Sequence, residues 1–179
     1  MNKLLKKVLN ISIYILVLLV LTYCAVLFLG QRISVIGSSM EPTLSDGDNL
    51  IVDKITYRFE EPKRFDIIVF PYQYASNTYY IKRIIGLPGE KIRIDAEGRI
   101  YINGEVLEEN YGKEVIADAG LAAAEIILGD DEYFVMGDNR NDSADSRFLS
   151  VGNIKRESIM GRAWLRIYPF QSFGILKHA

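Results

Sequence analysis

The stretch that decides the fold is Tyr79-Tyr80-Ile81-Lys82-Arg83-Ile84-Ile85-Gly86-Leu87-Pro88-Gly89-Glu90-Lys91-Ile92-Arg93-Ile94-Asp95. It opens with an apolar run of strand length and closes with a clean alternation that places Ile92 and Ile94 on one face. Between the two runs, Leu87-Pro88-Gly89-Glu90 has Pro and Gly at the positions where a type II turn requires them. Short strands separated by turn signals are typical of antiparallel β structure.

The same pattern continues on both sides of this stretch. Asn103-Gly104 is a strong signal for a two-residue hairpin. Ala117–Leu128 is the one segment that could be helical, and its Ala-rich, nearly uncharged composition fits an ordered loop equally well. We therefore predict an all-β domain of antiparallel sheets, without repeats. The other expected strands are Ile33–Ile36, Asn49–Asp53, Asp66–Phe70, Arg99–Ile102, Glu105–Leu107, Glu132–Met136 and Ser158–Tyr168.

The N-terminal segment predicts a membrane anchor. No Asp, Glu, Lys, Arg or His occurs from Val8 to Gln31. About 22 residues at about 1.5 Å rise cover roughly 33 Å, enough for a bilayer core of about 30 Å. Lysines precede the run, and the positive-inside tendency places that end in the cytoplasm. We predict a cytoplasmic N-terminus over 1–7, one transmembrane helix over 8–30 and an extracytoplasmic β-rich domain over 31–179, held at the plasma membrane.

Two other interpretations of this segment are weaker. A cleavable signal peptide has an apolar core of about 7–15 residues that ends in a small-x-small site. This run is longer, and Leu27-Phe28-Leu29-Gly30 offers no such site. Cys24 would suit a lipoprotein, but it lies deep inside the run behind the bulky Tyr23, so a small apolar helix residue is the simpler interpretation.

Composition narrows the possible chemistry. The chain has one Cys and one His, and the His is His178, next to the last residue. Intramolecular disulfides, Cys-based metal sites and Ser-His-Asp or Cys-His catalysis are therefore excluded. Setting aside the lysines before the apolar run leaves 18 basic and 23 acidic side chains, a balance that does not suggest nucleic acid as a partner. Hydrolytic chemistry must use Ser, Lys, Asp, Glu or Tyr, and we expect no metal and no cofactor.

Two polar features interrupt the strand pattern. Gly37-Ser38-Ser39-Met40-Glu41-Pro42-Thr43-Leu44 follows an expected strand and is by itself compatible with an ordinary turn. Lys82 and Arg83 interrupt an apolar strand, so alternation turns one of them toward the face of Tyr80. A long cation is seldom buried without a reason, although a lysine at a sheet edge would explain the same pattern.

A third feature is the polar loop over 137–147, which directly follows an expected strand. Its three aspartates could form a calcium loop, but the EF-hand spacing fails, because Arg140 occupies a ligand position and Ser143 the position of the obligatory Gly. A carboxylate pair for acid chemistry is another possibility, although the interleaved arginines indicate structural ion pairs.

Taken in order, these segments resemble type I signal peptidase, the leader peptidase of the general secretory pathway. The resemblance covers most of residues 32–170, and the N-terminal anchor fits the single-anchor, Gram-positive-like members. Four boxes carry it: Ser39-Met40-Glu41-Pro42-Thr43-Leu44, Arg64-Phe65-Asp66-Ile67-Ile68-Val69-Phe70, Tyr80-Ile81-Lys82-Arg83-Ile84-Ile85-Gly86-Leu87-Pro88-Gly89-Glu90, and Gly137-Asp138-Asn139-Arg140 with Ser143-Ala144-Asp145-Ser146-Arg147.

The resemblance implies an all-β, membrane-bound serine endopeptidase with a Ser/Lys dyad and no cofactor. Its substrates would be the N-terminal signal peptides of secreted preproteins emerging from the secretion channel, cut after small residues at −1 and −3. It implies that Ser39 is the nucleophile and Lys82 the general base, with Ser143 hydrogen-bonded to the lysine amine. It also implies charge pairs that hold the loop against the strand of the base, Asp138 with Arg83 and Asp145 with Arg147.

Two positions depart from the family pattern. Some members carry a Ser two positions before the nucleophile, where this chain has Gly37, so the oxyanion would depend on backbone N–H groups, chiefly that of Ser39. Phe65 replaces the Gly usual before the Asp, a change expected to alter local packing and no chemistry. The substrate pockets are expected to be lined by Val35, Ile36, Met40, Leu44, Val69, Tyr80 and Ile81.

A lysine can act as a base at neutral pH only if its pKa falls. An ordinary lysine, with a pKa near 10.4, is protonated at pH 7. Desolvation penalises the ammonium and can lower the pKa by several units. The apolar neighbours Tyr80, Ile81 and Ile84 predict such an environment for Lys82.

Two alternatives share parts of this pattern. Self-cleaving repressors use a Ser-Lys pair, but they carry a DNA-binding domain where this chain has its apolar run. Pilus-associated relatives of signal peptidase act as non-catalytic assembly factors, but they lack the active-site residues, whereas Ser39 and Lys82 are both present here.

Overall fold

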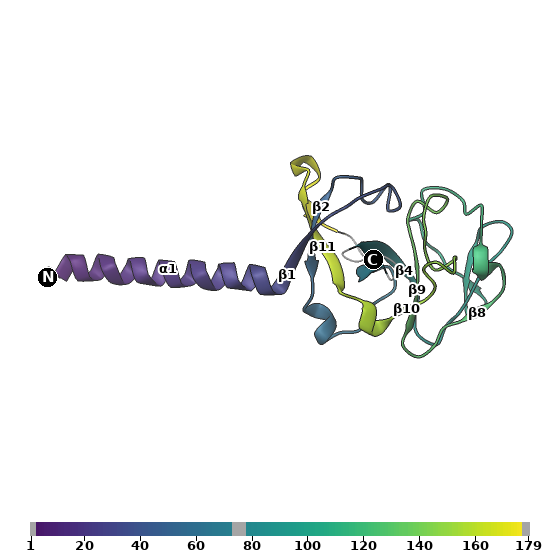
Figure 1. Cartoon of the computed structure of the whole chain (residues 1–179), viewed down its shortest axis with the longest axis horizontal. Coiled ribbons are helices and arrows are strands. Elements are labelled where there is room, and N and C mark those ends of the chain that lie inside the picture. The colour runs from purple at the N-terminus through teal and green to yellow at the C-terminus, as the bar shows by residue number, and fades with distance from the viewer. Residues whose placement is uncertain (1–2, 73–77, 177–179) are drawn as a thin grey trace.

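A long helix stands at one end of the molecule, and the strands are gathered at the other (Figure 1). The computed structural model describes residues 3–72 and 78–176, and over residues 3–5 and 23–29 it describes the backbone alone. His178, the single histidine, lies outside the described residues.

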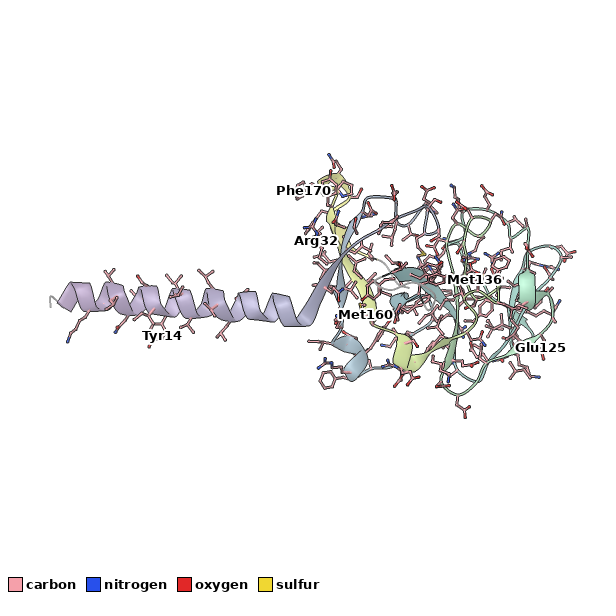
Figure 2. All side chains as sticks on the ribbon, viewed as in Figure 1. Tyr14, Arg32, Glu125, Met136, Met160 and Phe170 are labelled. Atoms are coloured by element: carbon pink, nitrogen blue, oxygen red, sulfur yellow. The ribbon has the colours of Figure 1, made fainter. Side chains whose placement is uncertain are left out.

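Helix α1 (Lys3–Leu29) extends away from the strands and is followed at once by strand β1 (Gly30–Ser34). Its described apolar side chains are exposed, and Tyr14 points into open space (Figure 2). Where side chains are described, no helix is both long enough and apolar enough to cross a membrane. The predicted transmembrane helix therefore stays a prediction.

The strands form two antiparallel sheets, which confirms the fold class predicted from the alternation. The large sheet lies next to α1, and the small sheet lies at the far end, around β8 (Figure 1). The large sheet has the order β1, β2 (Asn49–Asp53), β11 (Gly161–Tyr168), β3 (Ile67–Pro71), β4 (Tyr79–Gly86), β9 (Glu132–Met136) and β10 (Ile154–Lys155), and β12 (Gly174–Ile175) pairs with β11. The small sheet has the order β7 (Glu105–Val106), β6 (Ile100–Ile102), β5 (Lys91–Ile94) and β8 (Ile126–Ile127).

The predicted turns form where Gly permits them. After β4 the chain turns through Gly89, whose φ is +76°, and Glu90 N–H donates a hydrogen bond to Leu87 O at 3.2 Å. Between β6 and β7, Asn103 and Gly104 have φ of 53° and 88°. Positive φ at both central residues of a two-residue loop is the type I′ geometry that matches the twist of the flanking strands.

The ambiguous segment Ala117–Leu128 forms no α-helix. It contains the 3₁₀ turn η2 (Gly120–Ala123) and strand β8, and it packs inward through Ala122 and Leu128, which are 0% and 2% exposed. Further 3₁₀ turns are η1 (Thr56–Arg58), η3 (Arg156–Ser158) and η4 (Phe170–Ser172).

Three clusters of buried apolar side chains hold the sheets together. One cluster joins β4 and β9 to β5 and β6, through residues such as Ile92 and Phe134. Another includes Met40 and Leu44 from the loop after β1, exposed by 1% and 0%. Burying one such side chain contributes about 1.5–3 kcal/mol, so this loop is firmly attached to the large sheet on the C-terminal side of Ser39.

Candidate active site

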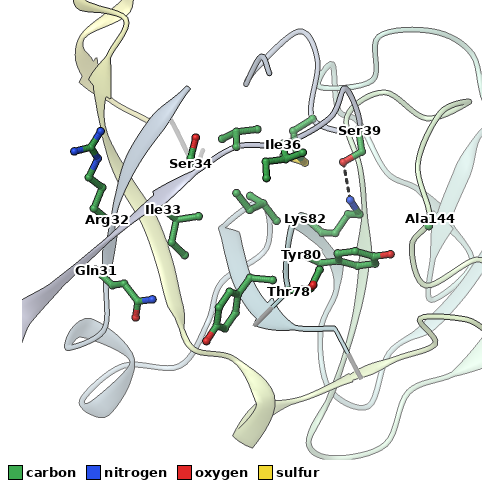
Figure 3. Close-up of a pocket in the computed structure, with 14 residues that line it drawn as sticks. Gln31, Arg32, Ile33, Ser34, Ile36, Ser39, Thr78, Tyr80, Lys82 and Ala144 are labelled. Atoms are coloured by element: carbon green, nitrogen blue, oxygen red, sulfur yellow. Dashed lines mark hydrogen bonds between the residues drawn. The ribbon is translucent and has the colours of Figure 1, made fainter. Parts of the chain in front are cut away.

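The centre of the site is a contact between Ser39 and Lys82. Ser39 lies in the loop after β1, Lys82 lies in β4, and Lys82 Nζ is 2.7 Å from Ser39 Oγ (Figure 3). Lys82 is 3% exposed. The structure therefore brings together the two residues that the sequence proposed as nucleophile and base, at a distance that permits proton transfer.

Burial governs the charge of Lys82. Desolvation lowers the pKa of Lys82 to about 8, although the charges of Asp145 and Asp138 act in the opposite direction. Among the described residues no carboxylate forms an ion pair with Lys82 Nζ, and the ring of Tyr80 lies 5.1 Å from it. With a pKa of about 8, roughly a tenth of the molecules carry a neutral Lys82 amine at pH 7. This amine can accept the proton of Ser39.

The loop that carries Ser39 is held on both sides of the serine. Before it, Gly37 has a φ of +94° and its N–H donates to Asp46 Oδ1 at 2.8 Å. Ser38 Oγ donates to Asp142 Oδ2 at 2.5 Å. Ser39 N–H itself has no hydrogen-bond partner in the part of the chain that the structure describes. That free donor is available to a developing oxyanion.

Arg83, the neighbour of Lys82, is 0% exposed and fully engaged. Its Nε and Nη2 donate to the two oxygens of Asp138 at 2.8 and 2.7 Å, and its Nη1 donates to Phe65 O at 2.9 Å. Its guanidinium stacks 3.8 Å from the ring centre of Tyr111, and Thr43 Oγ1 donates to Asp138 Oδ2 at 2.5 Å. The predicted Asp138–Arg83 pair thus ties the 137–147 loop to β4 and to the loop of Ser39.

The second predicted pair forms but has a different role. Arg147 Nε lies 2.8 Å from Asp145 Oδ1, and both residues are buried. Asp145 Oδ2 accepts from Gly137 N–H at 3.1 Å, and Arg147 Nη2 donates to Arg140 O. These bonds join one end of the loop to the other. The prediction that this pair holds the loop against β4 is wrong, because both partners lie in the loop.

Ser143 does not make the expected hydrogen bond to Lys82. Its Oγ is buried and has no hydrogen-bond partner among the described residues. It packs instead against Gly137, where an added Cβ would overlap both Ser143 Oγ and the backbone oxygen of Ser39. Only glycine at 137 allows the loop after β9 to approach the nucleophile loop this closely.

A cleft of about 530 Å³ opens beside the Ser39–Lys82 contact, between β1 with its following loop and the start of β4 (Figure 3). Of the predicted pocket residues, Val35, Ile36, Met40, Tyr80 and Ile81 line this cleft. The prediction was wrong for Leu44 and Val69, whose side chains are 0% exposed and pack in the apolar core. Sequence reasoning missed Gln31, Arg32, Ile33, Ser34, Thr78, Tyr79 and Ala144, which also line it.

Phe65 is more constrained than its substitution for Gly suggested. Its φ is +72°, in the left-handed region that glycine adopts without penalty. Its carbonyl accepts from Arg83, and its ring lies 5.0 Å from that of Tyr111. Phe65 therefore takes part in local packing and supplies a carbonyl to the charge cluster beside Lys82, and the expectation that its substitution changes no chemistry stays a prediction.

The aspartates of the polar loop serve as hydrogen-bond acceptors for protein groups. Asp138 accepts from Arg83, Asp142 from Ser38 and Asp145 from Arg147. Within the described ranges no group of three His, Cys, Asp or Glu side chains is arranged to hold a metal ion.

Comparison with known proteins identifies the family of this chain. The sequence pattern of the family described as "Signal peptidase, peptidase S26" matches residues 7–168. The chain belongs to this family. Ser39, Lys82 and the 137–147 loop all lie inside the matched region.

Individual signal peptidases are similar over most of the chain. The "Probable signal peptidase I-2" of Synechocystis sp. is 41% identical over 154 residues, which cover 83% of this chain and 68% of the relative. Signal peptidase I P of Bacillus subtilis subsp. natto is 35% identical over 173 residues, covering 92% and 90%. A solved signal peptidase I from Enterococcus faecalis V583 is 33% identical and covers 57% of this chain and 97% of its own, with a TM-score of 0.48.

Proposed function

We propose that this chain is a membrane-anchored serine endopeptidase that removes N-terminal signal peptides from secreted preproteins. The observation that carries the proposal is the buried Lys82 amine, 2.7 Å from Ser39 Oγ, at a cleft lined by two strands. Membership of the signal peptidase family supports the substrate class. A serine without the lysine, or a lysine without the serine, would not support a peptidase.

In the proposed reaction the neutral Lys82 amine takes the proton of Ser39. Ser39 Oγ attacks the scissile carbonyl, and the resulting oxyanion accepts a hydrogen bond from Ser39 N–H. The Lys82 ammonium then gives its proton to the leaving amine, which is the new N-terminus of the mature protein. Lys82 next takes a proton from a water molecule as the water oxygen attacks the ester. When the bond between the acyl carbon and Ser39 Oγ breaks, Lys82 returns this proton to Ser39 Oγ, and the signal peptide leaves with a new C-terminal carboxyl group.

Strand edges beside the cleft explain how a preprotein segment would be held. β1 lies at the end of the large sheet, and β9 pairs with β4 only from Arg83 onward, so Tyr79 to Lys82 have no β9 partner. An extended peptide can add to such edges through main-chain hydrogen bonds. The cleft walls of Val35, Ile81 and Met40 are suited to small side chains at −1 and −3.

We further propose that α1 anchors the enzyme in the plasma membrane, with its N-terminus in the cytoplasm. Support comes from the stretch from Val8 to Gln31, which lacks charged side chains, and from the projection of α1 away from the strands (Figure 1). From Gly30 to Ser39 the chain spans at most about 30 Å. The nucleophile would therefore stay near the outer leaflet, where a cleavage site emerges from the secretion channel.

Cleavage of a preprotein by the detergent-purified full chain tests this function. We expect release of mature product, and a loss of at least about a thousand-fold in kcat/KM for Ser39→Ala and for Lys82→Arg, because Arg cannot give up its proton. Ser150→Ala and Lys91→Arg, at exposed positions, are matched controls that should retain activity. Appreciable cleavage by Lys82→Arg would remove Lys82 from the role of base, and an inactive wild type would favour a non-catalytic assembly factor.

A further inference from the structure

The peptide group between Ser38 and Ser39 is held by the side chain of Asn139. Ser38 O accepts hydrogen bonds from Asn139 Nδ2 at 3.2 Å and from Glu41 N–H at 3.0 Å. Ser39 O accepts from the backbone N–H of Asn139 at 3.0 Å. Asn139 is 7% exposed. One buried residue therefore holds two successive carbonyls of the nucleophile loop.

These bonds set the direction of the Ser39 N–H. In a planar trans peptide the N–H points away from the preceding carbonyl, so fixing Ser38 O fixes Ser39 N–H in the opposite direction. Ser39 lines the cleft and Asn139 does not. The N–H that lacks a partner among the described residues thus points away from Asn139, and it belongs to a residue that lines the cleft.

A second contact from the same loop holds the side chain of Ser38. Ser38 Oγ donates to Asp142 Oδ2 at 2.5 Å, three positions beyond Asn139. Asp138, next to Asn139, is fixed in turn by its pair with Arg83. The residue before the nucleophile is therefore held through both its carbonyl and its hydroxyl by a loop that is itself fixed to β4.

We propose that Asn139 is a positioning residue for the oxyanion hole, acting through the Ser38 carbonyl to aim the Ser39 N–H at the oxygen under attack. The proposal rests on the function proposed above. As Ser39 Oγ bonds to the scissile carbon, the carbonyl electron pair moves to oxygen and the Ser39 proton passes to Lys82. The oxyanion then accepts from Ser39 N–H, while Asn139 touches neither substrate nor oxyanion.

The test is Asn139→Asp, which keeps the side-chain shape but replaces the amide donor by an acceptor facing Ser38 O. Removing one oxyanion donor costs about 10²–10³ in kcat, and we expect a misdirected donor to cost about 10–100-fold. KM for the preprotein should stay within about twofold, because substrate binding along the strand edges is unchanged. Asn141→Asp is the matched control, since Asn141 Nδ2 donates to Val115 O at 2.9 Å, and it should keep wild-type kcat.

A peptide aldehyde ending in alanine separates positioning from folding. The aldehyde carbon bonds to Ser39 Oγ and its oxygen becomes an oxyanion mimic, whereas the matching peptide acid forms no such bond. In Asn139→Asp we expect affinity for the aldehyde to fall about 10–100-fold and affinity for the acid to stay constant.

Three results would overturn the proposal. Unchanged kcat in Asn139→Asp would mean that Glu41 N–H alone fixes the Ser38 carbonyl. Equal losses of aldehyde and acid binding, with a lowered melting temperature, would assign Asn139 to folding. A wild-type chain that neither cleaves preprotein nor forms the aldehyde adduct would refute the proposed function itself, and a positive wild type with an unaffected Asn139→Asp would refute the positioning role alone.

Discussion

Lys82 and Arg83 are adjacent buried basic residues on the same strand, but their hydrogen-bond partners differ. Arg83 is 0% exposed and donates to Asp138, Phe65 and Thr43, so its charge is fully compensated. Lys82 is 3% exposed and its amine contacts the neutral hydroxyl of Ser39. The surroundings of Arg83 stabilise its positive charge, whereas those of Lys82 favour the neutral amine.

The difference shows how a strand can combine stability with reactivity. A buried charge is tolerated when it is paired, and an unpaired one shifts its pKa instead. The Arg83 pair fixes β4 and the 137–147 loop, which keeps the amine of Lys82 in place. Burial without a charged partner lowers the pKa of that amine, so a fraction of it is neutral and able to accept a proton at neutral pH. Arg83 therefore has a structural role, and its neighbour Lys82 has the proposed chemical role.

Replacing each cation by methionine should separate these roles most strongly. Arg83→Met leaves Asp138 buried and unpaired, and we expect the free energy of unfolding to fall by about 3–5 kcal/mol. Lys82→Met removes a desolvated ammonium, so stability should remain within about 1 kcal/mol of wild type or rise, while activity is lost. Urea unfolding of the full chain in detergent, followed by circular dichroism, measures both. Equal destabilisation by the two substitutions would contradict the comparison, and adding Asp138→Asn to Arg83→Met should recover part of the loss.

The pH dependence of kcat/KM should follow the neutral fraction of Lys82. With a pKa of about 8, activity should rise about tenfold from pH 6 to pH 7 and level off above about pH 8. The unfolded lysine, with a pKa near 10.4, binds more protons than the folded one between about pH 8 and 10.4, so the free energy of unfolding should increase with pH across that window. Lys82→Met should lack this increase. A flat activity profile from pH 6 to 8 would show that Lys82 is not the titrating base.

The smallest expected effect is at Phe65, which contacts Arg83 through its carbonyl and has no described contact with Lys82. Phe65→Ala and Phe65→Gly both lose the ring contact with Tyr111, but only alanine keeps a Cβ at a φ of +72°. We expect the glycine variant to be more stable by about 1 kcal/mol. At Tyr101 in β6, an ordinary strand position, the order should reverse, with glycine less stable than alanine by about 0.5–1 kcal/mol. The same order at both positions would show that the φ of Phe65 does not matter.

Much of the fold could be predicted from the sequence because it depends on local patterns, whereas the centre of the site was predicted from the order of the four boxes. The alternation of Ile92 and Ile94 and the Asn103-Gly104 pair act within a few residues, and the structure confirms both. The absence of a usable His directed attention to Ser39 and Lys82, although 43 positions separate them.

What the sequence could not show depends on how distant segments pack. Val69 alternates as a cleft residue would, but its side chain faces the apolar core. Ser143 fits a motif, yet the approach of Gly137 to the Ser39 backbone places its hydroxyl elsewhere. Asn139 lay within a recognised box, but nothing in the sequence indicated that its amide would reach the Ser38 carbonyl.

The direct passage from α1 into β1 has a consequence for how the enzyme would find its substrates. Helix α1 ends at Leu29 and β1 begins at the next residue, Gly30, without a linker between them. The distance between the catalytic domain and the surface that holds the helix can therefore vary only little. If α1 spans the bilayer as proposed, enzyme and preprotein are both held in the same membrane, and they meet by lateral diffusion in two dimensions. Rotation about the α1 axis would sweep the cleft around a circle at one fixed height. Effective substrate concentration would then be set by molecules per unit of membrane area.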